Sequence, residues 1–212
     1  MQLPDKSCIA SFDVHAQKSF TSLCPKELPV PDGLSIVDEL NAQARFACLR
    51  IGAKEAHNPN AIWVADDKHP QLSPVSGDNV DVRWVPHSIV GTKGFELIDG
   101  LPKITNYDYY VWMGIELDLH PYGACYHDIQ EKLSTGVIEY LRAHAITTVI
   151  LGGLATDYCV KNTARQLSEA KFTVILNLGA CRGISPDTVK TAMDEMRVSG
   201  IKMVNSASEF LP

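Results

Sequence analysis

The residue best suited to chemistry is Cys159, which follows an apolar run, two glycines and a threonine. Residues 149–151, Val-Ile-Leu, have the composition of a buried parallel strand, which Gly152 and Gly153 would end. Thr156 can then cap a helix that carries Cys159 in its first turn. There the free backbone N–H groups and the helix dipole favour thiolate over thiol, which suits a nucleophile. The same spacing is equally compatible with a small, buried, apolar cysteine.

Two further residues lie where they could meet Cys159. Asp13 is near the end of a predicted strand over residues 7–14, and Met113 ends another over residues 107–113. Ligands of parallel sheets collect at the carboxyl ends of the strands, so these positions are expected to converge. An aspartate at the end of a strand is also a common loop-capping residue, and both roles stay open for Asp13 on the residues alone.

The composition describes an ordinary globular chain of 212 residues with 45% hydrophobic and 21% charged residues. Its net charge of −6, without a basic run, argues against nucleic acid and anionic membranes as partners. No signal pattern opens the sequence, and no apolar run approaches the length of a membrane span. The six cysteines form no CxxC pair, so free thiols in a reducing, cytoplasmic setting are expected.

The order of elements predicts a single α/β domain over residues 1–212, with a mostly parallel sheet between two layers of helices. Strands are predicted over residues 7–14, 46–53, 107–113, 146–151, 171–177 and 201–204. Helices are predicted from residue 33 to about 45, over 135–145, around Cys159, and from Ser185-Pro186 to Gly200. The long polar segment over residues 55–83 is expected to be a functional loop. Neither a dinucleotide fingerprint nor a P-loop is present.

The segment GLATDYCV, residues 153–160, closely resembles the nucleophile turn of the isochorismatase-like cysteine hydrolases, in their nicotinamidase branch. The resemblance extends over nearly the whole chain and implies a three-layer α/β/α fold. It implies hydrolysis of nicotinamide to nicotinate and ammonia, with Cys159 attacking the carbonyl carbon. It also implies a cis peptide bond between Leu154 and Ala155, with the N–H groups of Ala155 and Cys159 forming the oxyanion hole.

The same resemblance assigns three side chains around the nucleophile. Asp13 matches the strand-one aspartate of the family, which takes the proton of the thiol. Phe20 would stack on the aromatic ring of the substrate, although the spacing from Asp13 to Phe20 departs from the usual one. Tyr122, in the segment that corresponds to an S-Y-S-like turn, is the second residue expected to bind substrate.

A metal site is implied by two further segments. WVPHSIVGTKG, residues 84–94, places His87 on a metal-ligand histidine, and KEAH, residues 54–57, places Glu55 and His57 on an Asp-x-His pair. The third histidine of the family would fall at about Ala61, which cannot bind metal. Glu55, His57 and His87 still make a two-His, one-carboxylate set for a divalent metal, with zinc as the expected ion.

The largest departure from the family is at the catalytic lysine, whose position falls on Met113. The nearest lysine, Lys103, is ten residues upstream at the other end of the strand, and the role is not transferred to it. His120 could supply a replacement positive charge. Without one, slow hydrolysis is expected, which Met113→Lys would raise.

Three functions therefore stay open: a nicotinamidase, a related cysteine hydrolase that acts on another small amide without metal, and a binding or regulatory homologue that has lost turnover. The expected partner is a small aromatic amide, with a homo-oligomer possible.

Overall fold

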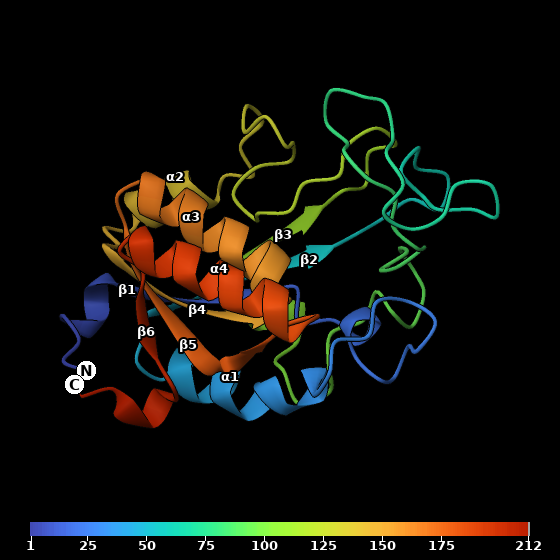
Figure 1. Cartoon of the computed structure of the whole chain (residues 1–212). Helices are drawn as coiled ribbons and strands as arrows, with labels where there is room; N and C mark the ends of the chain where they lie inside the picture. Colours follow the sequence, from blue (N-terminus) through green and yellow to red (C-terminus); the bar gives the residue numbers. More distant parts are fainter. Residues whose placement is uncertain (212) are drawn as a thin grey trace.

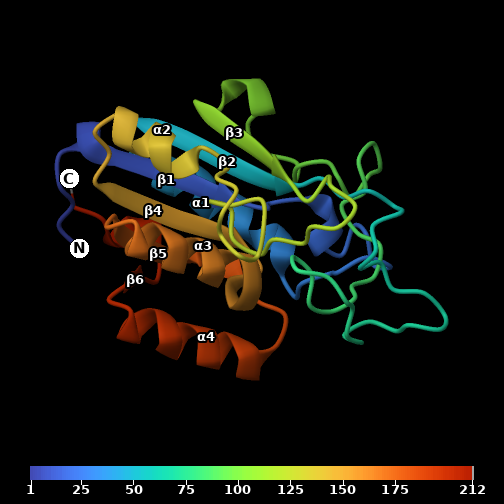
Figure 2. The ribbon, with the colours of Figure 1, turned by 90° about the horizontal axis from the view of Figure 1, so that it is seen from above.

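The computed structural model describes residues 1–211, and within them six parallel strands form one sheet in the order β3-β2-β1-β4-β5-β6. Figures 1 and 2 show this sheet with helices on both faces, which confirms the predicted α/β/α fold. The two termini lie side by side, since Leu3 and Leu211 are joined through a backbone hydrogen bond. The strands are β1 (Ile9–Val14), β2 (Leu49–Glu55), β3 (Tyr109–Met113), β4 (Thr148–Leu154), β5 (Thr173–Arg182) and β6 (Lys202–Val204).

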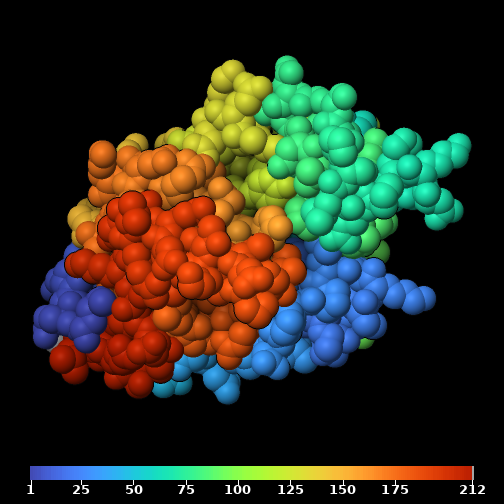
Figure 3. Space-filling view, viewed as in Figure 1, coloured from blue at the N-terminus to red at the C-terminus, as the bar shows by residue number. Residues whose placement is uncertain are grey.

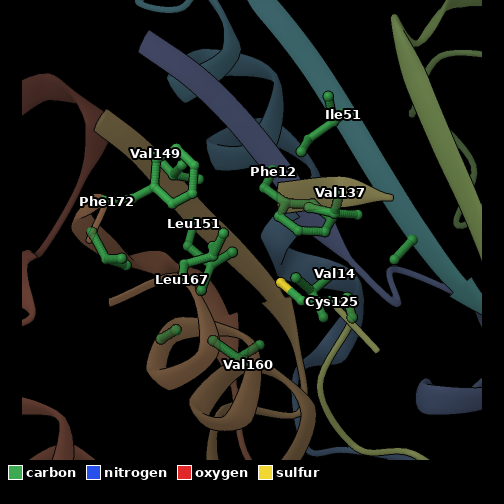
Figure 4. Packing of buried hydrophobic residues seen from close by; sticks show 14 of the residues in the cluster. Phe12, Val14, Ile51, Cys125, Val137, Val149, Leu151, Val160, Leu167 and Phe172 are labelled. Atoms are coloured by element: carbon green, nitrogen blue, oxygen red, sulfur yellow. The ribbon is translucent and has the colours of Figure 1, made fainter. Parts of the chain in front are cut away.

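Side chains of β1 alternate between the two faces of the sheet, as in any strand. Phe12 and Val14 pack in the main hydrophobic core (Figure 4), which also contains Cys159. Ser11 and Asp13 point to the opposite face, where Gln43 of α1 donates a hydrogen bond to Ser11. The helices are α1 (Val37–Ala44) on that opposite face, and α2 (Val137–Ala143), α3 (Lys161–Glu169) and α4 (Pro186–Val198) on the face of the main core.

The two glycines of β4 do not end the strand, contrary to the prediction. The strand runs on to Leu154 because Gly152 and Gly153 allow its neighbours to approach. A Cβ atom at Gly152 would lie 2.6 Å from the Cβ of Ala180 on β5, and one at Gly153 would lie 2.0 Å from the carbonyl oxygen of Val14 on β1. The close packing carries the chain directly to the turn that presents Cys159.

That turn differs from the predicted helix start. Thr156–Val160 form a single π-helical turn, and α3 begins only at Lys161. Ala155 precedes the turn, so Thr156 is not the capping residue. The peptide bond between Leu154 and Ala155 is cis, as predicted. By contrast, the predicted start of α4 is confirmed, because Ser185 accepts a hydrogen bond from the N–H of Thr188 and Pro186 follows it.

The long connection between β2 and β3 leaves the sheet at the carboxyl ends of the strands. Apart from one short 3-10 turn, Ile104–Asn106, residues 56–108 form no helix or strand. The first part of this connection projects at one end of the molecule (Figure 3), yet it carries the fully buried side chain of Trp63. No helix in residues 1–211 is both long and apolar enough to cross a membrane.

Candidate active site

Cys159 lies at the edge of a pocket at the carboxyl end of the sheet. Most of the pocket wall is aromatic or aliphatic, and the two residues predicted to bind substrate, Phe20 and Tyr122, both belong to it. Phe20 packs edge-on against His87, and the hydroxyl of Tyr122 accepts a hydrogen bond from the indole of Trp84. The remaining lining residues are Leu28, Glu55, His120, Ala155, Tyr158 and Ile184. An apolar, largely aromatic lining of this kind suits a small aromatic ligand.

Glu55, the last residue of β2, divides its carboxylate between two groups of side chains. Its Oε1 atom is 3.5 Å from the Sγ atom of Cys159 and 3.4 Å from Nδ1 of His15. Its Oε2 atom is 3.1 Å from Nε2 of His57 and 3.0 Å from Nε2 of His87. A single buried carboxylate therefore connects the thiol with the cluster of histidines.

His15 is the residue at this site that the sequence did not single out. It follows β1 directly, with a left-handed backbone at φ 47°, and its side chain is fully buried. Its potential ligand atom, the Sγ of Cys159 and an oxygen of Glu55 lie within 4.8 Å of one another. Neither ring nitrogen has a hydrogen-bond partner among the described residues. The unusual spacing from Asp13 to Phe20 was the signal, because an acceptor at His15 shortens that spacing.

Asp13 does not approach Cys159, so the prediction that it accepts the proton of the thiol is wrong. Its Oδ2 atom accepts hydrogen bonds from Nε and Nη2 of Arg50, at 2.9 and 2.6 Å, and from the hydroxyl of Tyr107 at 2.8 Å. Arg50 in turn donates to Asn41 of α1. The alternation of β1 explains this placement, since Asp13 faces α1 while Phe12 and Val14 face the core of Cys159.

The electrostatics keep Cys159 protonated at rest. Burial, and next the negative charge of Glu55, raise the pKa of the Cys159 thiol well above its usual value. The expectation of a resting thiolate was therefore wrong, because burial and the carboxylate outweigh the start of the helix. Burial alone would raise the pKa of Glu55, but His57 and His87 lower it well below the usual range, so Glu55 is a carboxylate. A thiol beside a carboxylate needs a base when it attacks.

Two of the histidines are oriented as metal ligands usually are. Nδ1 of His57 is 3.0 Å from the carbonyl oxygen of Gly114, and Nδ1 of His87 is 2.7 Å from that of Val85. Each carbonyl accepts a hydrogen bond from Nδ1, so Nε2 of each ring is the nitrogen directed at Oε2 of Glu55. Without a metal, a proton between ring and carboxylate lets His57 and His87 lower the pKa of Glu55. A divalent cation can take the place of such protons, so the predicted set of Glu55, His57 and His87 fits a divalent metal.

His120 belongs to this histidine cluster, and the suggestion that it supplies a positive charge is wrong. Its ligand atom lies within 4.8 Å of those of His57 and His87. Burial lowers the pKa of His120 well below its usual value, and the neighbouring His57 adds to the effect, so the ring is neutral.

Ala61, at the position of the missing ligand, is buried in an apolar cluster, and Lys103 is exposed ahead of β3. The side chain of Met113 is buried in the main core, and along the sheet Met113 of β3 lies opposite Glu55 of β2. Gly114 follows with φ 72°, and its carbonyl meets His57.

The chain resembles known proteins in both sequence and structure. The model of the isochorismatase domain matches residues 53–208. The nicotinamidase of Acinetobacter baylyi is 31% identical over 126 residues, 59% of this chain and 58% of that protein, so the match spans less than two thirds of the relative. A nicotinamidase pyrazinamidase of Acinetobacter baumanii is similar at a TM-score of 0.86 and 25% identity, over 97% of this chain and 98% of the other. A pyrazinamidase of Pyrococcus horikoshii in complex with zinc is similar at a TM-score of 0.73 and 26% identity, over 93% of this chain and 98% of the other.

Proposed function

This chain belongs to the isochorismatase family, and from that premise we propose that it hydrolyses a small aromatic amide, nicotinamide, to nicotinate and ammonia. The observation that carries the proposal is the grouping of Cys159, Glu55 and His15 at one side of an aromatic pocket. Relatives that carry the name nicotinamidase support the choice of substrate.

Cys159 is the proposed nucleophile and His15 its proton acceptor. The raised pKa of Cys159 means that its sulfur must lose a proton as it bonds to the carbonyl carbon. Glu55 lies nearest to the sulfur, but the two histidines on its other oxygen hold its pKa low, which makes it a poor base. His15 has no competing hydrogen bond, and Oε1 of Glu55 can stabilise the imidazolium that forms. A nucleophile, a base and an orienting carboxylate recur in many unrelated hydrolases.

The reaction then proceeds in two halves. In the first, the sulfur–carbon bond forms, the proton passes to His15, and the carbon–nitrogen bond breaks while His15 returns the proton to the departing ammonia. In the second, a water molecule gives a proton to His15 and attacks the thioester, which releases nicotinate and restores the thiol. We assign the oxyanion to the N–H groups of Ala155 and Cys159, and the hydrogen bond of the Ala155 backbone, which lowers the pKa of the thiol, supports that placement.

The aromatic ring of the substrate would lie between Phe20, Trp84, Tyr122 and Tyr158. A divalent metal at Glu55, His57 and His87 would bind the pyridine nitrogen and so fix the orientation of the ring. Glu55 and His87 of this set also line the pocket, which connects the metal site to the substrate. This donor set is the reason to prefer a nicotinamidase over a hydrolase that works without metal.

The experiment that tests the proposal measures ammonia and nicotinate release from nicotinamide by the wild-type protein and by Cys159→Ala. We expect equal amounts of both products from the wild type and none from the variant, with an unchanged circular dichroism spectrum. Benzamide, which lacks the ring nitrogen, is expected to be a poor substrate. Wild-type protein that releases no ammonia from either amide would contradict the proposal, as would full activity of Cys159→Ala.

A further inference from the structure

We infer that His120 is a ligand of the divalent metal together with His57 and His87, an inference that rests on the metal site of the proposed function. The family places its additional histidine on the connection after β2, where this chain has Ala61. His120 belongs to a different segment, the loop after β3, so it replaces that ligand in space but not in sequence.

The burial and isolation of His120 are the first support. Its side chain is 2% exposed, and neither ring nitrogen has a hydrogen-bond partner among residues 1–211. An imidazole buried without partners loses the hydrogen bonds that it makes to water, and nothing in the described residues replaces them. A metal ion bound to one of its nitrogens would offset most of that loss.

The second support is the way in which the segment of His120 is held. The N–H of Ile62 donates to the carbonyl of Leu117 at 2.9 Å, and the indole of Trp63 donates to the carbonyl of Leu119 at 3.1 Å. Ile62 and Trp63, next to Ala61, therefore hold the residues that lead to His120. The ring of His120 then packs 4.4 Å from that of Trp63 and stacks 5.4 Å from that of His57, measured between centroids.

The third support is the composition of the resulting donor set. The ligand atoms of His57, His87 and His120 lie within 4.8 Å of one another, and Oε2 of Glu55 lies beside the first two. Such an imidazole-rich set suits zinc and its transition-metal neighbours, whereas magnesium and manganese prefer oxygen ligands. Among the pocket-lining residues are both His87 and His120, so two of the three rings border the space for the substrate. The inference thus predicts a zinc site with little affinity for magnesium.

The test measures Zn²⁺ affinity of chelator-stripped protein by competition with a chromophoric chelator, with Mg²⁺ as the alternative ion. We expect His120→Asn and His120→Gln to lower Zn²⁺ affinity by more than about 100-fold, which exceeds the usual loss for an outer partner of a ligand. His69→Ala is the control, because His69 lies in the connection after β2, as His57 and His87 do, but is exposed and paired with Asp66. It is expected to bind Zn²⁺ as the wild type does.

Wild-type affinity in both His120 variants would overturn the inference, as would tight binding of Mg²⁺ by the wild type. The variant His57→Asn separates this failure from that of the underlying metal site. If His57→Asn loses Zn²⁺ while the His120 variants retain it, only the role of His120 fails. If all of them retain it, the metal site of the proposed function fails as well. Melting temperatures of the stripped proteins identify any variant that does not fold.

Discussion

Replacing His15 by glutamine should lower kcat strongly and leave KM almost unchanged. Glutamine keeps a polar side chain of similar length but cannot accept a proton at neutral pH. KM should be little affected because His15 is not among the residues that line the pocket. The loss of a general base commonly costs about 10²–10⁴-fold in rate.

The surroundings of the thiol narrow this range. Once His15 is replaced, Oε1 of Glu55, 3.5 Å from the sulfur, is the nearest substitute. An unperturbed carboxyl group has a pKa about two units below that of an unperturbed imidazole, and that of Glu55 is lowered further. Glu55 can therefore rescue only part of the rate. We expect kcat to fall by about 10²–10³-fold, which corresponds to roughly 3–4 kcal/mol of barrier.

Asp13→Asn is the matched control for His15→Gln, because the family resemblance assigns Asp13 as the base. The asparagine oxygen can still accept from Arg50 and Tyr107, but the charge is lost. We expect a loss of about 1.5–3 kcal/mol in the free energy of unfolding, the range for hydrogen bonds to charged groups. The rate of ammonia release, measured well below the melting temperature, should stay within about threefold of the wild type, an effect far smaller than the loss of a general base. Full activity of His15→Gln combined with an inactive, folded Asp13→Asn would refute the reasoning.

Three further predictions concern the surroundings of this pair. Gly114→Ala should lower Zn²⁺ affinity, because its Cβ would lie 2.6 Å from the ring of His57. Its control is Gly200→Ala, which has a similar φ of 77° and open space around it. That variant should bind Zn²⁺ normally and lose only about 1–2 kcal/mol in the free energy of unfolding, the cost of a left-handed residue. Alkylation of Cys159, followed by peptide mass spectrometry, should accelerate from pH 7 to 9 without a plateau because its pKa is raised, and Glu55→Gln should speed it up at pH 7. The structure reverses the expectation that Met113→Lys raises ammonia release, because Met113 is fully buried in the apolar core, where a lysine would lose its hydration, and Asp13 is held by Arg50 away from Cys159. An increase of tenfold or more would contradict this prediction.

Most of the fold could be predicted from the sequence because its signals are local. Apolar runs predict all six strands, and Ser185-Pro186 predicts the start of α4. The glycines of β4 show the limit of such signals. Gly152 and Gly153 are typical of a strand end, yet they lie within β4 because Ala180 and Val14 of the neighbouring strands approach them closely. Contacts across a sheet cannot be derived from one strand alone.

The residues of the candidate site could be predicted where each belongs to a recognisable local motif. Cys159, Glu55, His57, His87, Phe20 and Tyr122 do come together, as their motifs predict. His15 and Asp13 are only two residues apart, and which of them faces Cys159 depends on where β1 ends and the chain turns, which the sequence does not reveal. His120 could not be assigned to the histidine cluster because its path depends on hydrogen bonds to Leu117 and Leu119 that the sequence does not reveal.

The central claim, covalent hydrolysis by Cys159, is tested most directly by trapping the thioester. Wild-type protein is mixed with nicotinamide, quenched in acid within the first turnovers, digested and analysed by mass spectrometry. The account predicts a nicotinoyl group on the peptide that contains Cys159, absent without substrate and absent in Cys159→Ala. Hydrolysis that proceeds at the same rate in Cys159→Ala, or a nicotinoyl group found only on another cysteine, would contradict it.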